Sequence, residues 1–227
     1  MKRSNIFNWI GVLVGLLLFC ACEKNSEVIE EGSVTDADGN IYTTVKIGYQ
    51  IWMVENLKTT KYNDGTDIPH ISDSIEWAGI ISPGHSWYKN DIANKATYGA
   101  LYNFYSVDTD KLAPHGWHVA TNGEWEELIK YVGGTRIAGG KLKELGLAHW
   151  FAPNYGATNE YGFTALPGGF RHIDGSFMGL IYDGYWWTST AFGLPKPLCN
   201  SISYRTNDVY PLELSKTAGL SVRCVKD

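Results

Sequence analysis

The chain has 227 residues, of which 44% are hydrophobic, 14% aromatic and 19% charged. Its 24 acidic residues outnumber 19 basic ones, and no cluster of lysine and arginine interrupts the acidic balance. Such a surface repels phosphate backbones, so we expect no nucleic-acid partner. The length suits one domain with a sizeable core.

The first residues have the order of a bacterial export signal: two basic residues, an apolar run over residues 9–19, and the string CAC at 20–22. The run is shorter than the roughly 20 apolar residues that a membrane-spanning helix needs, which favours cleavage. Ala21 supplies the small residue that a lipoprotein signal requires before its cysteine. We therefore expect a signal peptide over residues 1–21 and a lipid on Cys22. The alternative is an ordinary secretory signal with free cysteines.

Residues 22–33 are expected to form the lipidated cysteine and a flexible acidic tether. Acidic residues directly after the lipidated cysteine resemble the surface-export signal of Bacteroidetes lipoproteins. This likeness implies a lipid-anchored protein of the outer membrane that faces the cell surface. Cleavage would leave 17 basic residues (19 minus 2) against 24 acidic ones, a net charge of −7. A single domain is expected over residues 34–227.

Residues 34–57 predict a β-hairpin or short meander with turns at Asp38-Gly39 and Gly48. Asp36, Asp38 and Asn40 have the spacing of the first calcium ligands of an EF-hand, but the later ligands are missing. We therefore favour a turn.

Residues 59–95 have no regular periodicity and predict a long loop-rich segment that carries Trp77, Trp87 and Tyr88. The segment Tyr98 to Val107 fits helix and strand spacing about equally, and its aromatic content favours a strand.

The clearest helix begins at Thr121, which precedes Glu124 by three residues in a capping-box arrangement. Gly133-Gly134 suits the end of this helix, and a shorter helix is expected over residues 141–145. The apolar face of the first helix is Trp125, Leu128, Ile129 and Val132. Short strands are expected beyond Trp150, so the pattern predicts an α+β fold.

Six strings in chain order resemble the Fibrobacter succinogenes major paralogous domain family. They are DGNIYTTVKIGYQIWMVENL from residue 38, YGALYNFY from 98, HGWHVATNGEWEEL from 115, GFTALPGGFR from 162, YWWTST from 185 and SVRCVKD from 221. Together they span nearly the whole expected domain. The GWH string with its capped helix is also similar to sulfatase-modifying enzymes and C-type-lectin-like domains. This likeness implies a mixed C-type-lectin-like domain of short twisted antiparallel strands, one or two helices and long loops, preceded by an N-terminal β-hairpin.

Cys199 and Cys224 would be the two cysteines left after lipidation. In an oxidising compartment a disulfide between them is the default expectation, with two buried thiols as the alternative. The family often carries a cysteine just before the PxGWH string, where this chain has Ala113. Cys224 would therefore need a partner other than the one that the resemblance implies.

No catalytic signature or cofactor motif is present in the sequence. His115 and His118 are spaced to share a metal, but the residues between them favour a packing motif at the helix entrance. The calcium-binding strings of true C-type lectins (EPN or QPD with WND) are also missing. Cysteine-based oxidase chemistry, as in formylglycine-generating enzymes, has no suitable thiol. We therefore expect neither an enzyme nor a metal site.

The expected function is non-catalytic binding of a glycan or another extracellular polymer at the cell surface. The alternatives are a protein-binding adhesion or envelope scaffold subunit and, less favoured, an enzyme of the sulfatase-modifying type. Aromatic faces suit sugar rings, with polar groups nearby for the hydroxyls. The candidate ligand-binding residues are Trp77, Trp87, Tyr88, Trp150, Asn154, Arg171, Tyr185, Trp186 and Trp187. The competing interpretation is that these aromatics close the core beneath a long loop.

Overall fold

The computed structural model describes residues 32–190 and 196–227 together with Met1. The predicted signal peptide, the lipid site at Cys22 and tether residues 23–31 fall outside this range. The first strand begins at Gly32, two residues before the expected start of the domain. In the described residues no helix is long and apolar enough to cross a membrane.

The first sheet opens with the expected meander, in which three strands pair antiparallel in chain order. Gly39 and Gly48 make the two turns with φ values of +83° and +62°, a region that suits glycine. The order of the sheet is β1-β2-β3-β12-β6, so β12 lies in its interior between β3 and β6. The bounds are β1 Gly32–Thr35, β2 Ile41–Ile47, β3 Gln50–Met53, β6 Trp117–Val119 and β12 Cys224–Lys226.

The acidic residues between β1 and β2 close a turn. Asp36 accepts hydrogen bonds through Oδ1 from the backbone N–H groups of Asp38 and Asn40, both at 2.9 Å. Asp38 in turn accepts a hydrogen bond from the Thr60 hydroxyl at 2.8 Å. These carboxylates therefore fix local backbone, as the turn interpretation predicted.

The second sheet has the order β11-β10-β9-β7-β8, and only its β7–β9 pair is parallel. Its bounds are β7 Gly168–Arg171, β8 Phe177–Leu180, β9 Asp183–Trp187, β10 Leu198–Ser203 and β11 Val209–Glu213. A two-stranded sheet joins β4 His85–Ser86 to β5 Leu101–Tyr102. The helical elements are α1 Ser74–Gly79, the 3-10 turn Tyr88–Asn90, α2 Asn94–Tyr98, α3 Phe104–Val107, α4 Asn122–Tyr131 and α5 Thr135–Leu142. The α+β prediction is confirmed.

Helix α4 begins as the sequence predicts. Thr121 Oγ1 accepts from the Glu124 N–H, and the Glu124 carboxylate accepts from the Thr121 N–H, so both halves of the capping box are present. The backbone turns away at Gly133, which has a φ of +115°.

Two predictions of secondary structure were wrong. Helix α5 covers residues 135–142 instead of 141–145, because Gly139 and Gly140 lie inside the helix. A Cβ atom on Gly139 would stand 2.4 Å from the carbonyl oxygen of Asp208, so glycine permits the close approach of this helix to that loop. The predicted strand over 98–107 is a two-residue strand, β5, between the short helices α2 and α3.

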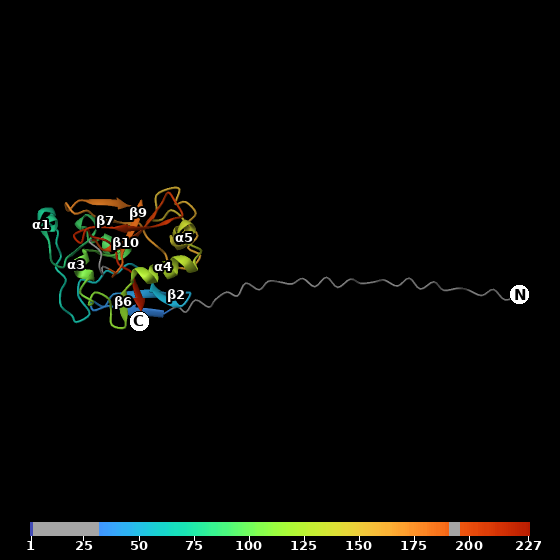
Figure 1. The fold of residues 1–227 in the computed structure, drawn as a ribbon, viewed down its shortest axis with the longest axis horizontal. Coiled ribbons are helices and arrows are strands. Elements are labelled where there is room, and N and C mark those ends of the chain that lie inside the picture. Colours follow the sequence, from blue (N-terminus) through green and yellow to red (C-terminus); the bar gives the residue numbers. More distant parts are fainter. Residues whose placement is uncertain (2–31, 191–195) are drawn as a thin grey trace.

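Two large cores and a small cluster of Ile71, Trp77 and Ile80 lie within the described residues. In Figure 1 the first sheet is at the bottom of the view and the second sheet at the top, with α4 between them. The first core includes Tyr42, Met53, Tyr102, Phe104, Trp187 and Leu220. The second core, against α4 and α5, includes Val45, Trp52, Trp125, Leu128, Phe163 and Trp186.

A buried guanidinium links these layers. Arg223 donates through Nη1 to the carbonyl oxygens of Met53 and Phe163, both at 2.9 Å. It also donates through Nε to Asn56 Oδ1 at 2.8 Å and through Nη2 to the Thr164 carbonyl at 3.0 Å. All four acceptors are neutral, and burial lowers the pKa of Arg223. The cation therefore connects β3 to the loop at 163–164 through hydrogen bonds without a carboxylate partner.

Candidate functional site

The tryptophans chosen from the sequence lie inside the protein. Trp77, Trp150, Trp186 and Trp187 are fully buried, and Trp87 is nearly so. The rings of Trp77, Trp150, Trp186 and Trp187 offer no face to a ligand, and Trp87 only borders a cavity beside His85. The structure therefore does not support the prediction that these tryptophans form one binding surface. Trp77 lies in helix α1, and Trp186 and Trp187 lie in strand β9. All five rings pack in the interior, as the competing interpretation expects.

Trp186 and Trp187 show how two neighbouring rings can both be buried. Adjacent residues of β9 point to opposite faces, and each face is covered by one of the two cores. The Trp186 indole N–H donates to Asn56 Oδ1 and that of Trp187 to the Tyr102 carbonyl, both at 2.8 Å. Both polar ends are satisfied internally. Both candidate rings are therefore part of the core.

The polar candidates Arg171 and Asn154 also hold loops. Arg171 is buried between the rings of Trp77 and Phe177, at 4.2 and 4.8 Å from their centroids. Its guanidinium donates to the carbonyl groups of residues 71–73 and 175. Asn154 donates through Nδ2 to the carbonyls of residues 144 and 146. Neither side chain is available to a ligand.

The two tyrosine candidates also have neighbours in the core. Tyr88 is buried, with its ring centroid 5.4 Å from that of Phe177. Tyr185 is partly buried against the first core and lies 4.9 Å from Phe170. They do not gather with the other candidates into one surface.

An exposed aromatic groove lies elsewhere, and the sequence did not reveal its rings. We define the aromatic groove as the cavity of about 580 Å³ lined by Phe151, Gly179, Tyr182, Asp183, Ser203, Tyr204 and Arg205. Phe151 is 46% exposed and Tyr182 is 39% exposed. The ring centroids of Phe151, Tyr182 and Tyr204 are 5.1 to 5.6 Å apart, so each ring contacts the other two.

Backbone hydrogen bonds bring these rings together from three distant segments. The Phe151 N–H donates to the Ile181 carbonyl at 2.8 Å, and the Tyr204 N–H donates to the Tyr182 carbonyl at 2.9 Å. The turn from β8 to β9 places Ile181 at a φ of +65°, which is unusual for a β-branched residue. The ring cluster is therefore held by main chain.

A buried lysine supports the groove from below. Lys143 is fully buried, and its ammonium donates to the carbonyl groups of Tyr155, Ser203 and Thr206 at 2.8, 3.0 and 2.8 Å. Burial lowers the pKa of Lys143 to about 8. All three ammonium hydrogens are used, so Lys143 fixes the strand end that carries Ser203 and Tyr204.

Charged groups of both signs stand beside the rings. Burial raises the pKa of Asp183, while a hydrogen bond from Ser203 and the charge of Arg205 oppose that rise. Arg205 is exposed and donates through Nε to the Tyr204 hydroxyl at 2.6 Å. The groove thus combines aromatic faces with a carboxylate, a hydroxyl and a guanidinium.

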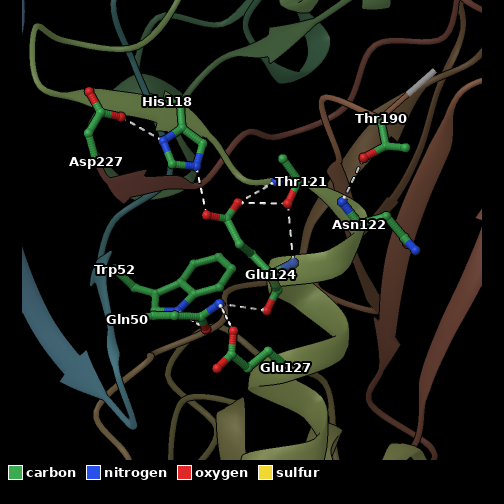
Figure 2. A network of polar contacts seen from close by, with 9 residues as sticks. All are labelled: Gln50, Trp52, His118, Thr121, Asn122, Glu124, Glu127, Thr190 and Asp227. Atoms are coloured by element: carbon green, nitrogen blue, oxygen red, sulfur yellow. Dashed lines mark hydrogen bonds and ion pairs between the residues drawn. The ribbon is translucent and has the colours of Figure 1, made fainter. Parts of the chain in front are cut away.

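A second polar cluster joins α4 to the end of β12, and Figure 2 shows it around Glu124. His118 contacts Asp227 through Nδ1 and Glu124 through Nε2, each at 2.7 Å. Burial lowers the pKa of His118, but the two carboxylates outweigh it and the net shift is upward. Since both ring nitrogens of His118 are engaged, this side chain links Glu124 of the helix cap to Asp227, the residue after β12. This agrees with the packing role expected at the helix entrance.

The same network extends along α4. The Gln50 amide donates to the Glu124 carbonyl at 3.1 Å and lies 3.4 Å from the Glu127 carboxylate, and it accepts from the Trp52 indole N–H. These contacts tie β3 to the helix.

The predicted disulfide is not formed. Cys199 and Cys224 are both free and buried, in β10 of the second sheet and β12 of the first. Cys224 stands beside Val119 and Cys199 beside Trp187 and Leu212 in strand register. Burial raises the pKa of Cys199 to about 12 and that of Cys224 further. The alternative of two buried thiols holds.

A family model described as the Fibrobacter succinogenes major domain matches residues 45–226. This range includes both sheets except β1 and the first part of β2, and it contains every residue of the aromatic groove. No curated protein and no solved structure matches the chain.

Proposed function

We propose that this chain, which belongs to the Fibrobacter succinogenes major domain family, binds a glycan or another extracellular polymer without catalysing a reaction. The proposed binding site is the aromatic groove. The observation that carries the proposal is a set of half-exposed rings held by main chain next to Asp183, Ser203 and Arg205. Sugar rings present apolar C–H faces to aromatic rings and hydroxyls to such polar groups.

The size and character of the groove support this choice. A cavity of about 580 Å³ falls within the range of small-ligand sites. The rings of Phe151, Tyr182 and Tyr204 are inclined to one another by 52° to 88°. They therefore form an angular surface that contacts one or two sugar units rather than a flat platform for a long chain.

The proposed location remains that of a surface lipoprotein. Residues 1–21 would be removed and Cys22 would carry the lipid, with the acidic segment after it as a tether. We also propose that the α+β domain is C-type-lectin-like, which rests on the GWH string and the capped helix that follows it.

A protein-binding adhesion or scaffold role is the second candidate. In the chain segment around Phe151, the side chains of Leu145, Leu147 and Tyr155 are exposed. Exposed apolar residues that gather on one segment are typical of protein interaction sites. An enzyme of the sulfatase-modifying type is the third candidate, and its expected chemistry would require a reactive thiol.

The test compares polysaccharide binding by the full chain and by groove variants, using glycan arrays and affinity electrophoresis. Phe151→Ala and Tyr182→Ala should weaken binding about tenfold, which is about 1.4 kcal/mol each. The matched control is Tyr49→Ala, because Tyr49 is 93% exposed in the β2–β3 turn outside the groove.

Melting temperature is measured on the same samples, so that lost binding is separated from lost stability. Groove variants that fold and bind polysaccharide as the unsubstituted chain does would exclude the groove as the site. If no polysaccharide binds but envelope proteins are retained through Leu145 and Leu147, the scaffold role replaces the proposal. Release of shortened glycan products would contradict the non-catalytic role.

A further inference from the structure

Two histidines lie side by side at the small β4–β5 sheet, and neither belongs to the aromatic groove. His85 is the first residue of β4, and the segment at His70 forms a parallel bridge with it. Backbone hydrogen bonds fix this register: the His85 N–H donates to the Pro69 carbonyl at 2.9 Å, and the Ile71 N–H donates to the His85 carbonyl at 3.0 Å. The main chain therefore holds the two imidazoles as neighbours.

The pair faces a cavity of about 390 Å³, whose wall also contains Asp67, Trp87 and Lys95. His85 is only 2% exposed, and its Nδ1 has no well-aligned hydrogen-bond partner among the described residues, while the backbone of Ile68 and Pro69 lies close to the imidazole. A buried imidazole nitrogen without a well-aligned partner is costly, and in a cavity wall a ligand can satisfy it. His70 is exposed at the mouth.

The separation of the rings suits a shared ion. Zinc binds imidazole nitrogen at about 2.0–2.1 Å, so two imidazoles on one tetrahedral ion have ring centroids roughly 5 Å apart. The centroids of His70 and His85 are 5.3 Å apart. Trp87 contacts both rings, edge-on to His85 at 5.3 Å and stacked with His70 at 6.4 Å, and so restricts their orientation.

We propose that His70 and His85 chelate one divalent late transition-metal ion, such as Cu²⁺ or Zn²⁺, which neutral imidazole favours. Water takes the remaining coordination positions.

The described residues contain no group of three or more His, Cys, Asp or Glu side chains placed to hold a metal. The ion is therefore held by two protein ligands and exchanges with solution, unlike a closed structural zinc. Lys95, whose Nζ lies 5.3 Å from the Trp87 ring centroid, places a positive charge nearby. This charge weakens the site, and the general affinity order predicts that Cu²⁺ binds more tightly than Zn²⁺.

The test is titration of the full chain with Cu²⁺ and with Zn²⁺ by calorimetry, together with electron paramagnetic resonance of the Cu²⁺ form. We expect one ion per chain and nitrogen hyperfine coupling from two imidazoles. His70→Ala should weaken binding at least about tenfold, since even outer-shell partners of metal ligands contribute that much. His70 is exposed, so the variant should keep the fold.

Two variants serve as matched controls. His115→Ala removes another exposed histidine, and His118→Gln removes the histidine that lies between two carboxylates, the strongest competing surface site. Both should bind Cu²⁺ as the unsubstituted chain does. Equal binding by His70→Ala, loss of binding in either control, coupling to a single nitrogen, or no one-to-one binding at all would overturn the proposal.

Discussion

Replacing the buried guanidinium of Arg223 should destabilise the whole domain. Arg223→Met keeps most of the volume but leaves the buried carbonyls of Met53, Phe163 and Thr164 without the guanidinium donors, while Asn56 Oδ1 still accepts from the Trp186 indole. An unsatisfied buried acceptor costs about 1–3 kcal/mol, so the three carbonyls together cost roughly 3–9 kcal/mol. Removing an unpaired buried charge returns several kcal/mol of desolvation energy. We expect a net loss of about 3–5 kcal/mol, a large part of the stability of a domain of this size.

The measurement is urea unfolding followed by tryptophan fluorescence, with the m-value checked to establish that the same unit unfolds. Arg223→Lys is the matched control: it keeps the charge but replaces a planar fork by a point charge with three donors. It should lose about half as much stability as Arg223→Met. If the methionine variant is as stable as the unsubstituted chain, the three carbonyls are satisfied without the guanidinium, and its role as a link between β3 and the loop at 163–164 is refuted.

Three further predictions concern α4 and the thiols. The pKa of His118 is higher in the folded protein than in the unfolded chain. Its contribution to the free energy of unfolding is therefore complete below the unfolded pKa of about 6.5. That contribution is lost as the pH rises through the folded pKa. His118→Gln should flatten this part of the stability–pH curve, and an unchanged curve contradicts the link between the helix cap and Asp227. Thr121→Ala should cost about 0.5–2 kcal/mol and Trp125→Ala about 3–5 kcal/mol in thermal unfolding, and a neutral Trp125→Ala would show that the helix face is misassigned. Cys199 and Cys224 should react with a thiol reagent only on unfolding, and mass spectrometry of non-reduced peptides that found them linked would contradict the two-thiol state.

Local signals in the sequence predicted the elements that depend on local chemistry. The capping box at Thr121 and Glu124 specifies the start of α4, because both hydrogen bonds lie within four residues. The start of α5 could not be found in the same way. Gly139 and Gly140 resemble the boundary of a helix in the sequence, yet they lie inside α5. Glycine is needed there because the loop at 207–208 packs closely against the helix, and this loop is distant in the sequence.

The groove was missed for a related reason. Phe151, Tyr182 and Tyr204 are single aromatics in separate segments, and only main-chain hydrogen bonds in the folded state gather them. Tryptophans expected in loops were chosen as ligand-binding candidates because loops usually lie at the protein surface. Here the loops around Trp77 and Trp150 are anchored by the buried cations Arg171 and Lys143, which draw carbonyl groups inward over the rings.

The interior position of β12 has a consequence for the timing of folding. Until synthesis has reached residues 224–226, β3 and β6 cannot join into one sheet, and each keeps an unpaired edge. The pairing of Val225 with Trp52 closes a loop of most of the domain, and such distant contacts form slowly. The second sheet ends with β11 at Glu213 and can pair before β12 is made, so the first sheet is the last one to be completed.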